Sequence, residues 1–362
     1  MRRAVRKTQA KPVPTLTRTD GLKRWAAISG KHNSGNGVRQ IARGQSYFHR
    51  PRRQWLQGPS PTAKQRQGAG DFIIGDASQI HVVLTFDDNF WAPAFAAARS
   101  ICLTTTRKQD VVLHLIHDGL REERKTDFAA LVTEFGCSVV HTELKDHAEF
   151  NAICRSLPVD RRLHTVMYAR LLLDRLLPAG ISRAIYLDCD TLVLTPIERL
   201  LEWDLEGKTI GAVSDPVRMV NMLGRDIHSK TGIFESTDPY FNSGVLVIDL
   251  VRFAAAKVPE RVDEFRRTGI LEKLYFDQDM LNLIFKGDWI ELPWRFNVMD
   301  PRVAHQSMHP FILHYTGRAR PWQLYSTVGH RRTYRHVMTN ELFYRYMRHR
   351  WVRSLKRLVG LR

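Results

Sequence analysis

Short apolar runs alternate with amphipathic stretches along the chain from about residue 79 onward. Ile80 to Thr85 is a nearly continuous apolar run, and the stretch from Trp91 to about Leu103 has the length and composition of a helix. Continuous apolar runs predict strands buried on both faces, and strands that alternate with helices need crossover connections, which make a sheet mostly parallel. The other predicted strands share this apolar character and lie at 111–116, 138–140, 184–187, 210–213 and 245–248. We therefore expect an α/β fold with helices that flank a mostly parallel sheet.

The pattern predicts three parts of the chain. Residues 1–76 are rich in Arg, Lys, Gln, Gly, Ser and Pro and have no sustained apolar period. Such a segment buries too little apolar surface to offset the entropy of ordering, so we expect a basic, mostly disordered extension. Residues 77–325 carry the alternating pattern and are expected to form the folded domain. Residues 326–362 are expected to form a basic amphipathic helical tail.

The net charge of +18 is concentrated at the two ends of the chain. Residues 1–70 contain sixteen Lys or Arg and one acid, and residues 318–362 contain twelve and one, so the stretch between them is acidic. A competing class is a nucleic-acid-binding protein whose tails hold phosphates, with an Asp pair as a nuclease-type or vestigial metal site. The acidic body and the absence of a nucleic-acid fold signature count against it. We expect no specific nucleic acid partner.

The tail has apolar residues at helical spacing, with Arg and Lys between them: Phe343, Met347, Trp351, Leu355 and Leu358. A basic amphipathic helix with Trp on its apolar face suits an anionic membrane surface, and the alternative is a helix packed on the body. We favour the membrane surface, which predicts a cytoplasmic protein associated peripherally with the inner face of the membrane. The four cysteines lack metal-like spacing and fit a reducing compartment.

Two carboxylates, Asp188 and Asp190, stand directly behind a predicted buried strand. Ligands of open α/β sheets lie at the carboxyl ends of strands, and a Mg²⁺ or Mn²⁺ ion on phosphates is usually held by one or two carboxylates. Asp is also common in plain turns, so the pair alone leaves both interpretations open. Asp87 and Asn89 follow the first strand at the same edge, where they either bond a ribose or base edge or cap a helix.

Polar residues also stand beside other apolar segments. Arg170 lies at the front of an apolar helix, where it either snorkels or reaches a diphosphate or sugar. Asn242 precedes a strand, and Asp277 and Gln278 begin a helix, so each suits either a ligand contact or an ordinary bulge or cap. His314 follows the apolar run 311–313, which is predicted to form a short strand, and is a candidate third metal ligand. Each signal is weak alone, and the set carries the weight.

Six motifs, in this order, resemble those of glycosyltransferase family 8, and most of all the bacterial lipooligosaccharide and lipopolysaccharide hexosyltransferases of the α-galactosyl or α-glucosyl type. The motifs lie within about 79–325 and are Asp87-Asp88-Asn89, Tyr168-Ala169-Arg170, Leu187-Asp188-Cys189-Asp190, Phe241-Asn242-Ser243-Gly244-Val245, Asp277-Gln278-Asp279-Met280-Leu281 and His314-Tyr315-Thr316-Gly317-Arg318-Ala319-Arg320-Pro321-Trp322. The resemblance implies a GT-A fold with a single Rossmann-like sheet and a nucleotide-sugar donor, usually a UDP-hexose. It also implies Mn²⁺ or Mg²⁺, a glycan or glycolipid acceptor as in lipopolysaccharide biosynthesis, and retention of anomeric configuration.

The resemblance also assigns roles to residues by motif position. Asp188, Asp190 and His314 would ligate the metal. Thr85, Asp87 and Asn89 would contact uridine, and the residues around the donor sugar would be Arg170, Asn242, Asp277 and Gln278. Gly317 and Arg320 would bind the diphosphate, which Asp188 also approaches. Asp215 would contact the acceptor.

Retention has two chemical routes. A double displacement needs a carboxylate near the anomeric carbon, with Asp277 as the candidate, whereas Gln278 is a poor nucleophile. The resemblance favours a same-face route in which the leaving phosphate helps to deprotonate the acceptor. Arg320 stands where the family has Lys, which keeps the charge but turns a point donor into a fork. An inactive, sugar-binding family member is the remaining alternative, and the intact metal set argues against it.

Overall fold

The computed structural model describes residues 79–157, 165–215, 232–235, 237–274 and 276–359. The chain divides into two units, Met1–Ala69 and Gly70–Arg362, and all described residues belong to the second. The predicted extension 1–76 lies outside the described residues, so its disorder stays a prediction.

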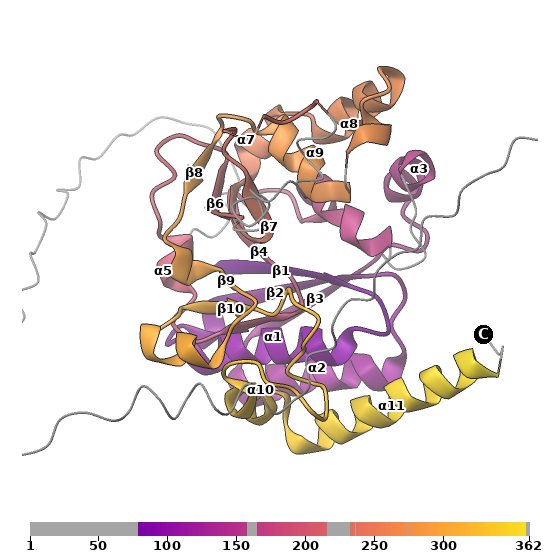
Figure 1. Ribbon diagram of the computed structural model, residues 1–362, viewed down its shortest axis with the longest axis vertical. Coiled ribbons are helices and arrows are strands. Elements are labelled where there is room, and N and C mark those ends of the chain that lie inside the picture. Colours follow the sequence, from indigo (N-terminus) through magenta and orange to yellow (C-terminus); the bar gives the residue numbers. More distant parts are fainter. Residues whose placement is uncertain (1–78, 158–164, 216–231, 236, 275, 360–362) are drawn as a thin grey trace, which may run out of the picture. The chain divides into compact units, whose positions relative to one another are not determined.

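A seven-stranded sheet lies at the centre of the described part of the chain, in the order β3-β2-β1-β4-β7-β6-β8 (Figure 1). Its strands are β1 Ile80–Phe86, β2 Val111–His117, β3 Ser138–Glu143, β4 Arg183–Leu187, β6 Ile210–Ser214, β7 Phe241–Asp249 and β8 Trp289–Glu291. β7 runs antiparallel to β4 and β6, and the other neighbouring pairs are parallel. The expected mostly parallel sheet is confirmed.

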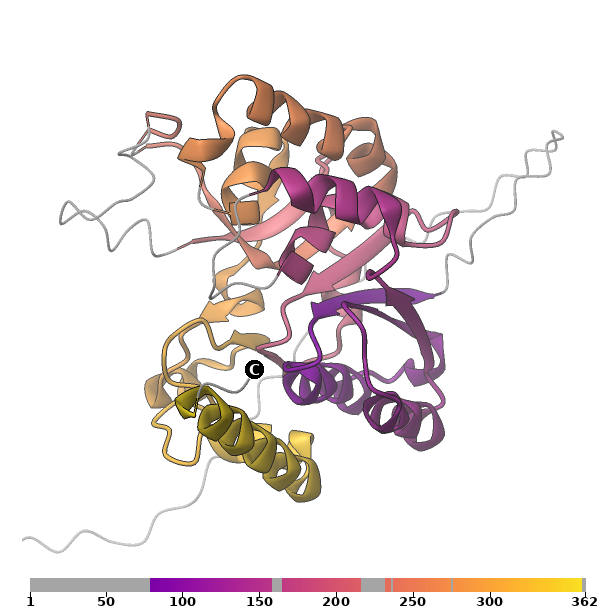
Figure 2. The same ribbon diagram turned by 90° about the vertical axis from the view of Figure 1, so that its right-hand side faces the viewer.

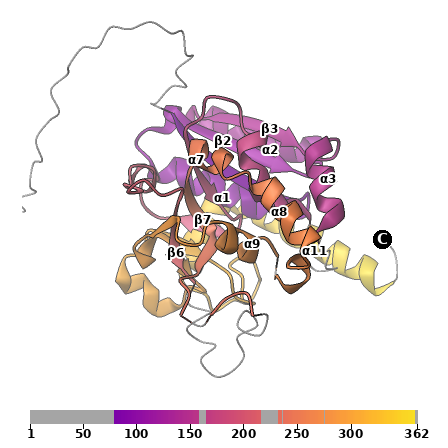
Figure 3. The same cartoon turned by 90° about the horizontal axis from the view of Figure 1, so that it is seen from above.

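Helices cover both faces of this sheet, so alternate residues of a strand enter different cores. On β1, Val82 and Leu84 join one core and Val83 joins the other. On one face lie α1 Trp91–Thr104 and α2 Glu122–Phe135, and on the other α3 Ala148–Ser156, α7 Leu250–Ala255, α8 Val258–Arg267 and α9 Phe276–Ile284 (Figures 1 and 3). Burial on both sides explains why β1 and β2 are apolar almost throughout.

A second, three-stranded sheet lies beside the first, in the order β5-β10-β9. Its strands are β5 Thr191–Val193, β9 Val298–Met299 and β10 Ile312–His314. β10 pairs antiparallel with β5, and His314 lies opposite Thr191. The short strand expected at 311–313 is confirmed as β10, whereas β5 and β9 were not expected, because strands of two or three residues are too short to show a period of two. This small sheet places the segment after β4 next to a distant part of the chain.

The C-terminal residues form α10 Arg331–Met338 and α11 Asn340–Leu358. Near α1, buried side chains from both helices, including Tyr334, Phe343 and Tyr346, enter the core. Trp351 and Leu355 are 63% and 60% exposed, and the end of α11 projects past α2 (Figures 1 and 2). The tail therefore combines the two alternatives, a packed first half and an uncovered second half. Among the described residues, no helix has the length and apolar content to cross a bilayer.

Candidate active site

The Asp188 loop leaves the main sheet at the end of β4 and is held from two directions. The backbone N–H of Asp188 donates to the carbonyl of Gly244 on β7 at 2.8 Å, and the N–H of Tyr315, after β10, donates to the carbonyl of Asp190 at 2.9 Å. Gly244 lies on β7 and Tyr315 directly follows β10, so the backbone that carries the two carboxylates is held in place by both sheets. They lie at the carboxyl end of β4, where the strand pattern predicted them.

His314 completes a three-residue cluster with these carboxylates. Its Nε2 lies 3.1 Å from Oδ1 of Asp190 and 3.5 Å from Oδ2 of Asp188, and the side chain is buried. One ligand atom from each residue lies within 4.8 Å of the others. Two carboxylates and an imidazole suit a divalent cation, with the carboxylates favouring Mn²⁺ or Mg²⁺. The structure thus brings together the three predicted metal ligands.

Gly244 makes the close approach of these side chains possible. A β-carbon at this position would collide with Cε1 of His314 and would lie 2.6 Å from Oδ2 of Asp188. Only a residue without a side chain fits there. The glycine at this position therefore has a specific cause, which is room for the side chains of Asp188 and His314.

Asn297 fixes which nitrogen of His314 faces the carboxylates. The amide of Asn297 donates to Oδ1 of Asn242 at 2.9 Å, so its own oxygen accepts from Nδ1 of His314 at 3.0 Å. In the neutral imidazole, Nε2 then carries the lone pair toward Asp188 and Asp190, as metal-binding histidines require. Asn297 was missed by the sequence interpretation, because it lies in none of the six motifs.

The cluster is electrostatically coupled. Burial alone opposes ionisation of Asp190, but His314 and Arg320 outweigh it and lower the pKa of Asp190 to about 2. Burial lowers the pKa of His314, but Asp190 and Asp188 outweigh it and raise that pKa above its ordinary value. The carboxylates thus attract positive charge to this point, which either a proton or a cation supplies.

Arg170 is a buried clamp rather than a snorkelling side chain. It lies on the 3₁₀ helix Thr165–Leu172 and is 6% exposed. Its Nη2 donates to Oδ1 of Asp188 at 2.7 Å, its Nη1 donates to the carbonyl of Ser243 at 2.9 Å, and its Nε forms an ion pair with Asp277 at 2.8 Å. Arg170 therefore holds one oxygen of Asp188 and leaves the other facing His314.

Gln278 and Asn242 form a second polar network. Nε2 of Gln278 donates to Asp215 at 2.9 Å, and its Oε1 accepts from the N–H of Ser243 at 3.1 Å. Asn242 also donates to Asp215, at 3.2 Å. Asp277 is 2% exposed, and burial raises its pKa although Arg170 opposes the rise. The predicted donor-sugar residues thus form one connected layer beneath Asp188.

A cavity of about 350 Å³ opens in front of the Asp188 loop. Six of the predicted residues line it: Thr85, Asp87, Arg170, Asp188, Asp190 and Arg320. Arg320 also forms an ion pair with Asp190. Asn89 is not among the lining residues, but its amide donates to the carboxylate of Asp87 at 2.8 Å, so it orients Asp87. A β-carbon on Gly317 would lie 2.9 Å from Cγ of Asp300, so this glycine makes room for Asp300.

A second cavity of about 410 Å³ borders the polar network. Asp215 and Asn297 line it together with Trp294, whose side chain is 45% exposed. Asp215, the predicted acceptor residue, therefore lines this second cavity and is in hydrogen-bond contact with the predicted donor-sugar residues Asn242 and Gln278. Trp294 was missed, because an isolated aromatic residue in a short turn has no distinctive sequence pattern.

Comparison with known proteins gives the same family as the motifs. Residues 81–325 match the family described as glycosyl transferase family 8. General stress protein A of Bacillus subtilis (strain 168) is 25% identical over 277 residues, which cover 72% of this chain and 93% of that protein. The lipopolysaccharide 1,2-glucosyltransferase of Escherichia coli (strain K12) is 29% identical over 196 residues, which cover 51% of this chain and 57% of that one.

Two solved structures have the same architecture. The galactosyltransferase LgtC in complex with donor and acceptor sugar analogs matches with a TM-score of 0.58 at 22% identity, covering 72% of this chain and 95% of that chain. The apo structure of the bifunctional glycosyltransferase WbbM matches with a TM-score of 0.61 at 20% identity, covering 77% and 53%. The expected GT-A fold is confirmed. Because the family match extends over most of the chain, the protein belongs to glycosyl transferase family 8 and is a glycosyltransferase.

Proposed function

We propose that the protein transfers a hexosyl group from a nucleotide sugar, a UDP-hexose, to a glycan or glycolipid acceptor with retention of anomeric configuration. The observation that supports this most is the convergence of Asp188, Asp190 and His314 at the mouth of one cavity. Asp188 and Asp190 follow β4, whereas His314 comes from a distant part of the chain and is brought to them by the pairing of β10 with β5. A buried cluster of acids and imidazole is costly unless it binds a cation or a proton.

In this proposal Asp188, Asp190 and His314 hold Mn²⁺ or Mg²⁺. A bound cation supplies charge neutralisation on the phosphates of the donor, where negative charge grows as the diphosphate departs. Arg320 lines the same cavity and stabilises the same charge from the protein side. Arg170 keeps Asp188 in its ligating orientation.

The uridine end of the donor and its diphosphate leaving group contact other residues of the protein. Thr85 and Asp87 line the cavity and contact the uridine, while Asn89 orients Asp87. Gly317, beside Asp300, is assigned to the diphosphate from its motif, which also contains Arg320.

We favour the same-face route for retention. Asp277 is buried and ion-paired to Arg170, and it is absent from the cavity wall that the described residues form. Gln278 uses both ends of its amide within the protein network. Neither group has the freedom expected of a nucleophile at the anomeric carbon, so Asn242, Asp277 and Gln278 shape the sugar site instead.

The acceptor is assigned to the second cavity, at Asp215 and Trp294. An exposed indole offers an apolar face to a sugar ring, and a carboxylate accepts hydrogen bonds from its hydroxyls. The lipopolysaccharide glucosyltransferase among the relatives supports a surface-glycan acceptor. The uncovered end of α11, with Trp351 and Leu355, supports peripheral attachment to the inner face of the membrane.

The proposal is tested by a screen of nucleotide sugars for hydrolysis with and without Mn²⁺. We expect turnover of one UDP-hexose that needs the cation and disappears in Asp190→Ala. Asp263→Ala, which removes an exposed acid on α8, is the matched control and should keep wild-type activity. Turnover by Asp190→Ala equal to that of the wild type would remove Asp190 from the metal site.

A further inference from the structure

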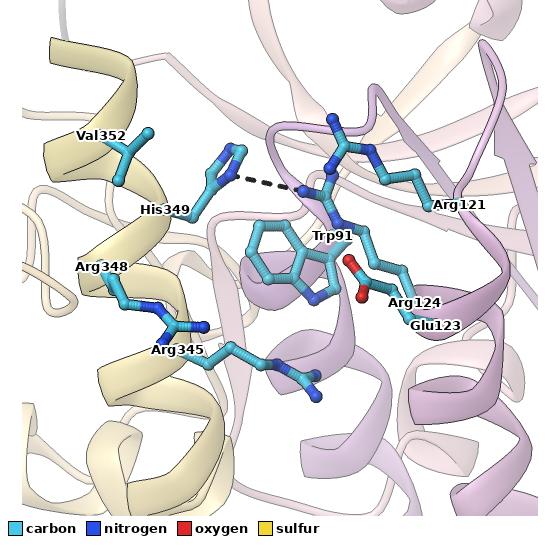
Figure 4. Close-up of a pocket in the computed structure, with 8 residues that line it drawn as sticks. All are labelled: Trp91, Arg121, Glu123, Arg124, Arg345, Arg348, His349 and Val352. Atoms are coloured by element: carbon cyan, nitrogen blue, oxygen red, sulfur yellow. Dashed lines mark hydrogen bonds between the residues drawn. The ribbon is translucent and has the colours of Figure 1, made fainter. Parts of the chain in front are cut away.

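A third cavity, of about 230 Å³, lies where α11 passes the N-terminal ends of α1 and α2 (Figure 4). Four arginines, one histidine and one tryptophan contribute to its wall: Arg121, Arg124, Arg345, Arg348, His349 and Trp91. We call this cavity the arginine pocket. None of these residues belongs to the donor or acceptor sites assigned above.

The arginines of this pocket differ in how far they are already neutralised. Arg124 is buried, lies 3.9 Å from the centroid of the Trp91 ring and pairs with Asp88. Arg345 pairs with Asp127. These two guanidinium groups are therefore held rigidly in the wall.

The other two arginines keep most of their charge available. The side chain of Arg121 is 65% exposed and lies 3.3 Å from the same Asp88, while Arg348 is exposed. Glu123 is the one acid in the described wall. The pocket also lies at the N-terminus of α2, where the helix dipole adds positive potential.

The hydrogen bonding and the pKa of His349 reflect the excess of positive charge in this pocket. Because Arg124 is only a donor, Nδ1 of His349 accepts from it at 3.4 Å, and the proton resides on Nε2. That Nε2 is buried and has no acceptor among the described residues. Burial lowers the pKa of His349, and repulsion by Arg124 lowers it further. The wall has more donors than acceptors, which is the complement of an oxyanion.

The same helix continues from this charged wall into an apolar surface. Val352 lines the pocket, and Trp351, Leu355 and Leu358 lie within the next two turns at 60% exposure or more. A ligand that fills both regions needs a phosphate beside hydrocarbon. Guanidinium forks bind phosphate through two parallel hydrogen bonds, and several of them favour a dianion over a monoanion.

We propose that the arginine pocket binds the phosphate monoester of a membrane lipid. This inference deepens the membrane attachment in the proposed function and rests on it. Attachment through the exposed end of α11 is nonspecific for anionic surfaces, whereas the pocket adds recognition of one headgroup chemistry.

The test uses the full chain and vesicles matched in surface charge, with either phosphatidic acid, a monoester, or phosphatidylglycerol, a diester. We expect roughly tenfold tighter binding to the monoester, which corresponds to about 1.4 kcal/mol. Arg121→Gln combined with Arg348→Gln should abolish the preference while keeping diester binding. Both side chains are exposed, so the fold should tolerate their loss. Arg350→Gln with Arg357→Gln removes the same charge from α11 outside the pocket wall and should keep the preference.

The outcomes separate the two claims. Absence of binding to either vesicle would overturn membrane attachment, and with it the pocket proposal. Equal binding of the wild type to both vesicles would overturn the pocket proposal alone. Glycerol 3-phosphate should compete with the monoester vesicles for binding to the protein. Its binding should also raise the pKa of His349, which is measured from the imidazole resonances of that residue. Competition equally strong against the double variant, or an unmoved His349, would overturn the assignment to this pocket.

Discussion

Gly244 faces His314 so closely that a β-carbon on the glycine would occupy the space of the imidazole. The same β-carbon would press on Asp188. We expect Gly244→Ala to lower Mn²⁺-dependent activity by about a hundredfold, since displacement of a site by about 1 Å has costs of that size. A Mn²⁺ titration of donor hydrolysis measures this. Val245→Ala, in the same strand, should lower stability but leave the half-saturating Mn²⁺ concentration unchanged.

Asn297 should act as a positioning residue for the metal site. Asn297→Ala removes the acceptor of Nδ1 and frees the His314 ring, and loss of such a partner typically costs 10- to 100-fold in metal affinity. We expect a raised half-saturating Mn²⁺ concentration and near-normal turnover at saturating metal. An unchanged titration curve would argue against the orienting role.

Arg170 and Asp277 form a buried ion pair whose halves depend on each other. Removing one partner of such a pair destabilises a protein by about 3–5 kcal/mol, because the other charge stays buried alone. We therefore expect Arg170→Met to unfold at much lower denaturant than the wild type. The double variant Arg170→Met with Asp277→Asn should recover part of the loss. Additive effects in chemical denaturation would contradict this coupling.

Acid should destabilise the fold through two histidines on β2. Burial lowers the pKa of His114 and of His117 from 6.5 to about 4. The unfolded chain then binds more protons between pH 6.5 and 4, so stability is full above this window and falls as pH falls through it. The slope is up to about 1.4 kcal/mol per pH unit for each histidine. Denaturation midpoints across this range should fall less steeply in His117→Asn, and an identical slope would exclude His117.

Truncation of the tail should give two different results at two positions. Ending the chain after residue 350 removes Trp351 and Leu355, which are exposed, and should abolish liposome binding while sparing donor hydrolysis. Ending it after residue 325 also removes buried Tyr334, Phe343 and Tyr346, and should expose core and lower the melting temperature. Liposome binding by the chain that ends after residue 350 would reject the membrane role of the exposed half of α11.

The sequence predicted what depends on local pattern. β4 is a buried apolar strand, so Asp188 and Asp190 had to emerge at a sheet edge, and motif order added His314. It did not predict how His314 reaches them, because β5 and β10 are three residues each and their pairing joins segments over a hundred residues apart. Asn297 was invisible for the same reason, since its contacts are long-range.

The tail shows a second limit of sequence patterns. Helical spacing marks Phe343 and Trp351 as one apolar face, yet Phe343 is buried against the body and Trp351 is exposed. Periodicity identifies a face but says nothing of what covers it. The packing of α11 depends on the position of α1, and the whole sheet determines that position.

Asp88 connects the turn at Asp87 and Asn89 with the arginine pocket. It stands between Asp87 and Asn89, and its carboxylate pairs with both Arg121 and Arg124. An anion that binds those arginines competes with Asp88. By thermodynamic reciprocity, a change in the turn that we propose for the base affects the arginines to the same degree. The proposed headgroup binding and the proposed nucleotide binding are then linked, so that the affinity for each depends on whether the other is bound.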